Sequence, residues 1–491
     1  MKPSSEKIRK FTTAQAVRAI IATVICGLIV VEACVIKYYV VGSPVSAGIW
    51  FCMLTLVIAA TMLFGGLLMF AMVSRTFIIA NTRYYVAFIT VITLSFIAHI
   101  YLSIISPLLI APGLTAMIIV QLSRQKQDAF IFNMTEAFMT LTALLFESIM
   151  TDGEVFAVIG YGEGLYLWQL LGMSVINIGA GALIPMLLRD KTRRVNYILV
   201  GLCMTVASVA VFALMALVNE NRISLLKYFW LVFISGAAPL VLAQFVNPAM
   251  ESVFNLVTDN RLVELTNTKQ PLLKRLATEA PGTYNHSLAV ANFAETCAAA
   301  IGEDPYLARA AAYYHDVGKL ANPSYFAENQ AGYNPHDDIL PEVSAEIIRS
   351  HTTDGYNTLK QYRLPDEITR VAVEHHGTLP ITVFYERAKM LTDGEVDVKD
   401  YSYHGETPTS RIAGIIMICD SGEAAIRAMD KPDGERVDKL LRAIINDRIT
   451  RGQFDRCKLS LMDLDTIRKT IINAYGGLFH KRVKYPGGEA K

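Results

Sequence analysis

The chain has 491 residues, of which 53% are hydrophobic and only 18% are charged. A typical soluble domain carries roughly 25% charged residues, so this composition points to lipid contact rather than to a wholly soluble protein. The net charge of +1 supplies no basic field that would favour a nucleic-acid polymer as partner. The seven cysteines contain no CxxC pair and do not form a disulfide framework.

Apolar runs in the first half predict eight membrane-spanning helices, because a spanning helix needs about 20 mostly apolar residues. They cover residues 18–36, 47–73, 84–102, 104–122, 130–149, 166–188, 197–218 and 229–250. The fifth span is the most polar, with Asn133, Glu136 and Glu147. Glu32 and His99 are further ionisable groups inside spans, where such groups usually face the bundle interior as a ligand pocket or a structural pair.

Loop charge predicts the orientation of the spans. Lys and Arg precede the first span and follow the second, fourth and sixth, whereas the loop near 151–165 has three acidic residues and no Lys or Arg. The positive-inside rule therefore places the N-terminus in the cytoplasm, and an even number of spans places the second half there too. An uncleaved first helix is preferred to a signal peptide, because no clear small-x-small site follows it.

The composition changes at about residue 251 to that of a soluble helical domain. We expect a transmembrane region over 1–250, a helical connector over 251–280 that is broken at Pro271, a soluble domain over 281–480 and a polar tail over 481–491. No alternating strand run is visible, so the predicted fold class is all-α throughout. Helical periodicity marks 285–301, 305–318, 341–352, 365–376, 409–429, 434–448 and 463–475.

Five histidines and two aspartates of the soluble half form an ordered series. It runs His286, His315-Asp316, His351, His375-His376 and Asp420. Imidazole and carboxylate together suit Mn, Fe or Zn. Adjacent residues on a helix point about 100° apart, so a doublet can serve one cavity only where other helices surround it. Such a site suits two metals about 3.5–4 Å apart, bridged by Asp316, which can bind a phosphoryl oxygen.

The order and neighbours of these residues resemble a known family. The series from His286 through 315–319 to Asp420 looks like the HD phosphohydrolase superfamily, and His351 with 375–376 looks like its binuclear branch. The segments 280–287, 325–330 and 334–337 resemble the seven-transmembrane HD family of the PgpH type. That resemblance implies a bacterial inner-membrane phosphodiesterase with a cytoplasmic HD domain, which opens cyclic di-AMP to linear pApA.

The resemblance also implies roles for single residues. One metal ion would be held by His286, His315, Asp316 and Asp420, and the other by Asp316, His351, His375 and His376. The two divalent ions are expected to be Mn or Fe. Lys319 would face a substrate phosphate and act in catalysis together with Asp316. His336 and Asp337 are candidates for the substrate pocket, with a plain turn role as the alternative, and His404 is expected to be a loop histidine.

Two features depart from the family pattern. Only a short loop joins Lys37 to Ala47, where the family usually has a large extracytoplasmic domain, and Ile412 stands where an acidic residue is usual. The expected partners are a cyclic dinucleotide and the lipid bilayer, with a homodimer left open and no nucleic-acid polymer.

Three alternative functions stay open. The first is hydrolysis of cyclic di-GMP, although this chain reads Gly377-Thr378-Leu379-Pro380 and lacks the GYP signature of that branch. The second is a nucleotide-binding receptor without turnover, and the third is a transporter regulated by its HD domain.

Overall fold

The computed structural model describes residues 82–123, 126–150, 165–188, 194–218, 228–392, 394–430 and 432–478, with three single helical positions at 21, 24 and 28. Apart from those positions, the predicted spans 18–36 and 47–73 and the polar tail 481–491 lie outside the described residues. Within the described ranges the chain is helical, with one isolated bridge between Pro380 and Ser402 and no strand. The predicted all-α fold class is confirmed.

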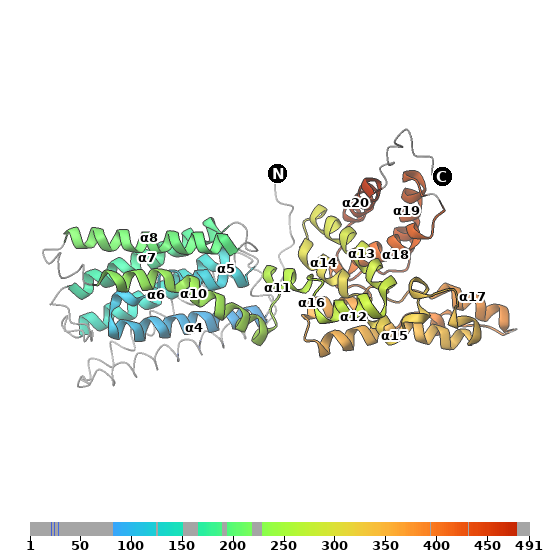
Figure 1. The fold of residues 1–491 in the computed structure, drawn as a ribbon, viewed down its shortest axis with the longest axis horizontal. Helices are drawn as coiled ribbons and strands as arrows, with labels where there is room; N and C mark the ends of the chain where they lie inside the picture. Colours follow the sequence, from blue (N-terminus) through green and yellow to red (C-terminus); the bar gives the residue numbers. More distant parts are fainter. Residues whose placement is uncertain are drawn as a thin grey trace, which may run out of the picture. The chain divides into compact units, whose positions relative to one another are not determined.

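The chain divides into two compact units, Met1–Asn260 and Arg261–Lys491 (Figure 1). The predicted connector 251–280 straddles this division. It contains α11 (Asp259–Leu265) and α12 (Pro271–Glu279), and the break falls where Pro271 begins the second helix. Proline is favoured at the first position of a helix because its missing N–H has no intrahelical partner there.

Long helices build the first unit. They are α4 (Thr82–Ile105), α6 (Lys126–Met150), α7 (Leu165–Leu187), α8 (Arg194–Val218) and α10 (Phe229–Phe254). Among the described residues four helices are long and apolar enough to cross a membrane, at 83–105, 168–187, 195–217 and 229–254. Large apolar side chains such as Leu202, Phe245 and Val253 are exposed on α8 and α10, as lipid contact requires. The chain is a membrane protein.

The predicted fourth span is not one continuous helix. Residues 104–122 form the end of α4, a 3₁₀ turn η1 (Pro107–Leu109) and the nine-residue helix α5 (Leu114–Leu122). Pro112 cannot continue the hydrogen-bond ladder, and Gly113 adopts a left-handed conformation with φ of 73°. All of α5 is buried within the bundle, so the prediction of an uninterrupted helix is wrong here.

Asn133 and Glu136 of α6 are buried in the bundle interior and pair with other polar groups. His99 Nδ1 lies 2.7 Å from Glu136 Oε1, and Asn177 donates to Glu136 Oε2 over 3.1 Å. The backbone N–H of Gly113, at the break before α5, donates to Asn177 Oδ1 over 2.8 Å, and Asn133 donates to the Asn177 carbonyl. Non-helical backbone at membrane depth is tolerated where such partners satisfy it. The contacts favour a structural pair for His99 and Glu136.

The second unit is a cluster of helices around α13, which packs against α12, α14, α18 and α20. Its α-helices after α12 are α13 (Pro281–Ala300), α14 (Pro305–Tyr314), α15 (Pro341–Gln361), α16 (Asp366–Glu374), α17 (Thr382–Leu391), α18 (Arg411–Arg427), α19 (Gly434–Thr450) and α20 (Leu461–Leu478). Short 3₁₀ turns connect them, namely η2 (Val317–Ala321), η3 (Pro323–Tyr325), η4 (Ala327–Asn329), η5 (Pro335–Asp338) and η6 (Val398–Tyr401).

Two predicted helices end earlier than expected. The segment 305–318 is α-helical only to Tyr314, and 365–376 only to Glu374. After the first, the chain tightens into η2, where Gly318 passes so close to α15 that a Cβ atom would lie 1.9 Å from the His351 carbonyl oxygen. Both doublets therefore lie at helix ends rather than on helical faces.

Candidate metal centre

Seven side chains from five segments converge in the second unit. They lie on α13 (His286), at the end of α14 (His315) and before η2 (Asp316), on α15 (His351), after α16 (His375 and His376) and on α18 (Asp420). All except His376 are buried. Their donor atoms form two groups, each with atoms within 4.8 Å of one another: His286, His315, Asp316, Asp420; and Asp316, His351, His375, His376.

Asp316 belongs to both groups because each of its oxygens faces one of them. Its Oδ1 lies 3.4 Å from His351 Nε2 and 3.5 Å from His375 Nε2. Its Oδ2 lies 3.3 Å from His315 Nε2 and 3.7 Å from His286 Nε2. This arrangement is the one a carboxylate needs to bridge two cations.

Asp420 closes the first group from α18. Its Oδ1 lies 2.9 Å from His286 Nε2 and 3.6 Å from His315 Nε2, whereas its Oδ2 lies 3.7 Å from His376 Nδ1. Ser410 caps the start of α18 by accepting from the N–H of Ala413 over 3.1 Å.

One departure from the family pattern lies in the same helix. The side chain of Ile412 is buried at the position where the family usually has an acidic residue.

The helix ends explain how a doublet can serve one cavity. His315, the residue directly after α14, keeps α-helical backbone angles, and Asp316 leaves them with φ of −104° and ψ of 12°. The backbone changes direction at Asp316, and both side chains of the doublet reach one cavity, whereas adjacent side chains on a regular helix point about 100° apart.

The donor atoms fit divalent metal ions. His315 Nε2 and Asp316 Oδ1 are buried without a hydrogen-bond partner, although buried polar atoms nearly always have one. The Nε2 atoms of His351 and His375 lie 3.4 Å apart, while the Nδ1 atoms of both rings face carbonyl oxygens of their own helices. A ring whose Nδ1 is held in this way presents Nε2 to a metal. Nitrogen and carboxylate donors together suit first-row divalent ions.

Charge differs between the two groups. Burial opposes ionisation of Asp316, but the charges of His315 and Lys319 outweigh it and hold the pKa of Asp316 well below its usual range. Burial also opposes protonation of His315, yet the neighbouring carboxylates raise its pKa to about 10. In the second group burial prevails and lowers the pKa of His351 to about 3. Burial likewise lowers the pKa of His376 well below its usual value.

Lys319 lies beside the bridging carboxylate. Its Nζ is 2.7 Å from Asp316 Oδ2 and 2.9 Å from Glu328 Oε1, and it sits 5.0 Å from the centre of the Phe326 ring. Glu328 also accepts from Thr283 Oγ1 over 3.0 Å. Burial opposes the charge on Lys319, but the two carboxylates raise its pKa above the usual value, so the ammonium stays charged.

Tyr403 covers the second group. Its ring stacks on His376 at 4.3 Å with planes 23° apart, and its edge-on contact with His351 is 5.9 Å. The backbone N–H of Tyr403 donates to the carbonyl of Leu379 over 2.9 Å, which fixes the loop after η6 against the segment that follows His376.

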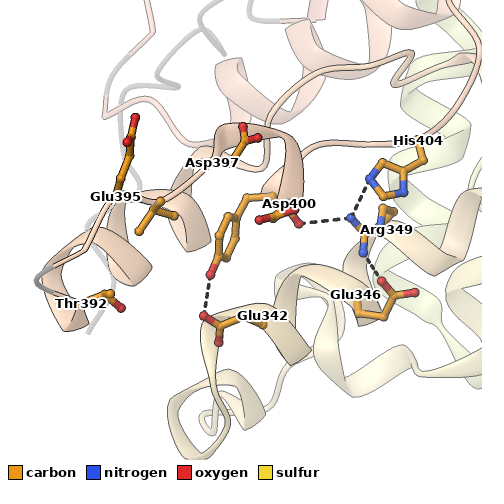
Figure 2. Close-up of a pocket in the computed structure, with 10 residues that line it drawn as sticks. Glu342, Glu346, Arg349, Thr392, Glu395, Asp397, Asp400 and His404 are labelled. Carbon is orange, nitrogen blue, oxygen red and sulfur yellow. Dashed lines mark hydrogen bonds and ion pairs between the residues drawn. The ribbon is translucent and has the colours of Figure 1, made fainter.

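Arg349, two residues before His351 on α15, anchors the same loop (Figure 2). It donates to the carbonyls of Asp400 and Ser402 over 3.2 and 3.3 Å and to His404 Nε2 over 3.1 Å. Arg349, Asp400 and His404 border a cavity of about 530 Å³, and its acidic wall comprises Glu342, Glu346, Glu395, Asp397 and Asp400. His404 is thus a loop residue that contacts α15, as the sequence suggested.

The two remaining sequence candidates lie in η5. His336 is buried between Tyr325 and Phe384, with its Nε2 2.9 Å from the Tyr325 carbonyl oxygen. The carboxylate of Asp337 is exposed, and the carbonyls of both residues accept from Arg387. The structure gives His336 a packing role, and substrate contact by either residue stays a prediction.

Sequence reasoning missed three residues at the centre, Glu328, Tyr403 and Glu423. Glu423 Oε2 lies 2.5 Å from His286 Nδ1, on the opposite side of that ring from the other donors. Its position one helical turn after Asp420 was the available signal, because residues three apart share a helix face. Glu328 lies inside the segment 325–330 that carries the family resemblance.

Comparison with known proteins agrees with this geometry. The HD domain family matches residues 283–425, a range that includes all seven donors. Two curated relatives are named cyclic-di-AMP phosphodiesterase PgpH. The one from Listeria monocytogenes serotype 1/2a (strain 10403S) is 38% identical over 365 residues, and the one from Bacillus subtilis (strain 168) is 38% identical over 348 residues. The matches cover 73% and 70% of this chain.

The chain belongs to the PgpH-type family of HD-domain proteins. This PgpH-type chain spans about half the length of the two curated relatives, 50% and 47%. The crystal structure of the L. monocytogenes PgpH HD domain in complex with cyclic-di-AMP is 43% identical, with a TM-score of 0.42. It covers 44% of this chain, and the chain covers 100% of it.

Proposed function

We propose that this chain is a membrane-bound phosphodiesterase that hydrolyses cyclic di-AMP to pApA with two divalent metal ions, Mn or Fe. The observation that carries the proposal is the bridging geometry of Asp316, whose two oxygens face two complete donor groups. The names of the two curated relatives support the choice of cyclic di-AMP as substrate.

The residues of this chain would divide the work as follows. His286, His315, Asp316 and Asp420 would hold one ion, and Asp316, His351, His375 and His376 the other. Two ions bound side by side would polarise the phosphoryl oxygen and make water more acidic. Lys319 would place its ammonium against a non-bridging phosphate oxygen and stabilise the charge that develops there.

The reaction consumes one water molecule. Its oxygen bonds to one phosphorus of the cyclic dinucleotide as the P–O3′ bond breaks, a proton from the water passes to the departing 3′ oxygen, and the product keeps a 5′ phosphate. Tyr403 would exclude bulk water above the second group, since its ring lies flat on His376. We place His336 and Asp337 at the edge of the substrate pocket.

The test is turnover by the purified full chain in detergent. The chain is incubated with cyclic di-AMP or cyclic di-GMP and with Mn²⁺, Fe²⁺ or a chelator, and products are separated by chromatography. We expect pApA from cyclic di-AMP, dependent on metal. If the chain opened cyclic di-GMP but not cyclic di-AMP, the assignment of cyclic di-AMP as the substrate would be wrong. Binding of either nucleotide without product would favour a receptor and overturn the enzyme.

We further propose an eight-crossing topology in a bacterial inner membrane, with the N-terminus and an HD domain over 281–480 in the cytoplasm. The alternation of basic and acidic loops supports it. Reporter fusions near residue 157 should label as external and those near 191 as cytoplasmic. The opposite labelling at either position would contradict the orientation.

A further inference from the structure

The histidines of the centre differ in what supports the ring nitrogen turned away from the cavity. For His315, His351 and His375 the Nδ1 atom lies 2.5–3.1 Å from a carbonyl oxygen three or four residues earlier in the chain. His286 has no such neighbour in the contacts described for α13. Its Nδ1 lies 2.5 Å from Glu423 Oε2, a carboxylate 137 positions further along the chain.

Glu423 is itself held in place. It lies on α18 three residues after Asp420, it is only 7% exposed, and its Oε1 lies 2.5 Å from Arg427 Nη2. One oxygen therefore serves His286 and the other serves Arg427. Since Asp420 Oδ1 faces His286 Nε2 from the same helix, α18 contacts both nitrogens of one ring.

We infer that Glu423 is a positioning residue that makes the first donor group the tighter of two unequal metal sites. A carboxylate that accepts the Nδ1 proton fixes the tautomer in which Nε2 is free to ligate, and it makes the ring a stronger donor. A neutral carbonyl does this less strongly. The inference rests on the proposed two-metal function.

The composition of the groups adds to the difference. The first group has Asp420 as a carboxylate of its own and shares Asp316, whereas the second has three imidazole rings and only the shared carboxylate. More negative charge around a divalent ion favours its retention. The two ions should therefore bind in sequence, the first group filling at lower metal concentration.

The test is a metal titration that uses no nucleotide. The full chain in detergent is stripped of metal and titrated with Mn²⁺ against a chromophoric chelator. The parent should show two classes of site. Glu423→Gln should weaken the tight class by about 10–100-fold and leave the weak class unchanged. Glu423→Ala should weaken it further, and Arg427→Gln should weaken it less than Glu423→Gln.

The matched control is Glu295→Gln. Glu295 lies on α13, as His286 does, and pairs with Arg309 at 2.9 Å without contacting a donor residue. It should titrate as the parent does. Thermal unfolding of the metal-free proteins separates positioning from stability, because a merely structural role for Glu423 would lower the melting temperature without changing the tight-site affinity.

Two results would overturn the inference: parental tight-site affinity in Glu423→Gln, or equal weakening of both classes. If the parent turned over cyclic di-AMP while Glu423→Gln titrated normally, the inference would fall and the proposed function would stand. If Glu423→Gln lost tight metal binding while the parent left cyclic di-AMP intact, the inference would stand and the assignment of cyclic di-AMP as the substrate would be wrong.

Discussion

Lys319 Nζ lies 2.7 Å from Asp316 Oδ2 and lies outside the two candidate metal-donor groups. An ammonium next to a bridging carboxylate does not help to hold cations there, because like charges repel. Its position would stabilise an additional anionic group, such as a substrate phosphate, that binds beside the two metal ions.

We therefore predict that Lys319→Ala keeps two metal ions per chain while turnover of cyclic di-AMP falls by about 10²–10³-fold, the effect of losing one electrostatic stabiliser. Metal analysis of the purified variant and initial rates check this. Lys360→Ala, which removes an exposed lysine paired with Asp366, is the control and should behave as the parent does. Loss of metal from Lys319→Ala would show that the lysine supports the site rather than the substrate.

Gly318→Ala should disrupt the contact between η2 and α15. A Cβ atom there would lie 1.9 Å from the His351 carbonyl oxygen and 2.5 Å from the Gly355 nitrogen, so backbone that carries a donor must move. We expect a loss of at least about 2 kcal/mol in the free energy of unfolding and weaker metal binding by the second group. Chemical unfolding of the full chain in detergent measures the first, and metal titration measures the second.

Gly434→Ala is the matched control for that change. Gly434 begins α19, its φ is not left-handed, and a Cβ would meet nothing within 4 Å. The variant should be unchanged or stabilised by up to about 1 kcal/mol, since alanine restricts the unfolded chain. If both variants unfolded alike, the close approach at Gly318 would have no energetic consequence.

Asn177→Ala should destabilise the transmembrane bundle. It would leave the N–H of Gly113 and one oxygen of Glu136 without partners in a buried environment. Interhelical hydrogen bonds in membranes contribute modestly, so we expect a loss of about 1–2 kcal/mol. Thr142→Ala on α6 removes only an exposed bond to the Phe138 carbonyl and should change little. Equal melting temperatures for Asn177→Ala and the parent would contradict the role of this network.

The seven donors could be predicted because their spacing along the chain follows a family pattern. The geometry that makes them a site could not. Both doublets were expected on helices, yet they lie where α14 and α16 end. After α14 the backbone tightens into η2, where Gly318 approaches α15. Helical periodicity cannot place such an end, since the partner surface is remote in sequence.

The same limit applies to the partner of Glu423 but not to the broken span. Glu423 shares a helix face with Asp420, yet its contact with His286 joins positions 137 apart, which no local pattern encodes. In contrast, the break within residues 104–122 had a local signal in Pro107 and in Pro112-Gly113. Hydropathy averaged over the whole segment does not show this signal. Asn133 and Glu136, which help to make the fifth span the most polar, pair with other polar groups inside the bundle.

The central claim is that one carboxylate serves two metal ions in a phosphodiesterase site. Metal content and cyclic di-AMP turnover of His315→Ala and Asp316→Ala test it most directly, with the helical content of each variant as a check on folding. We predict that both variants lose hydrolysis. Asp316→Ala should retain less metal than His315→Ala, because its loss affects both groups and leaves two cations without the charge between them. If His315→Ala or Asp316→Ala kept two ions per chain and most of the parental activity, the assignment of this site would be contradicted.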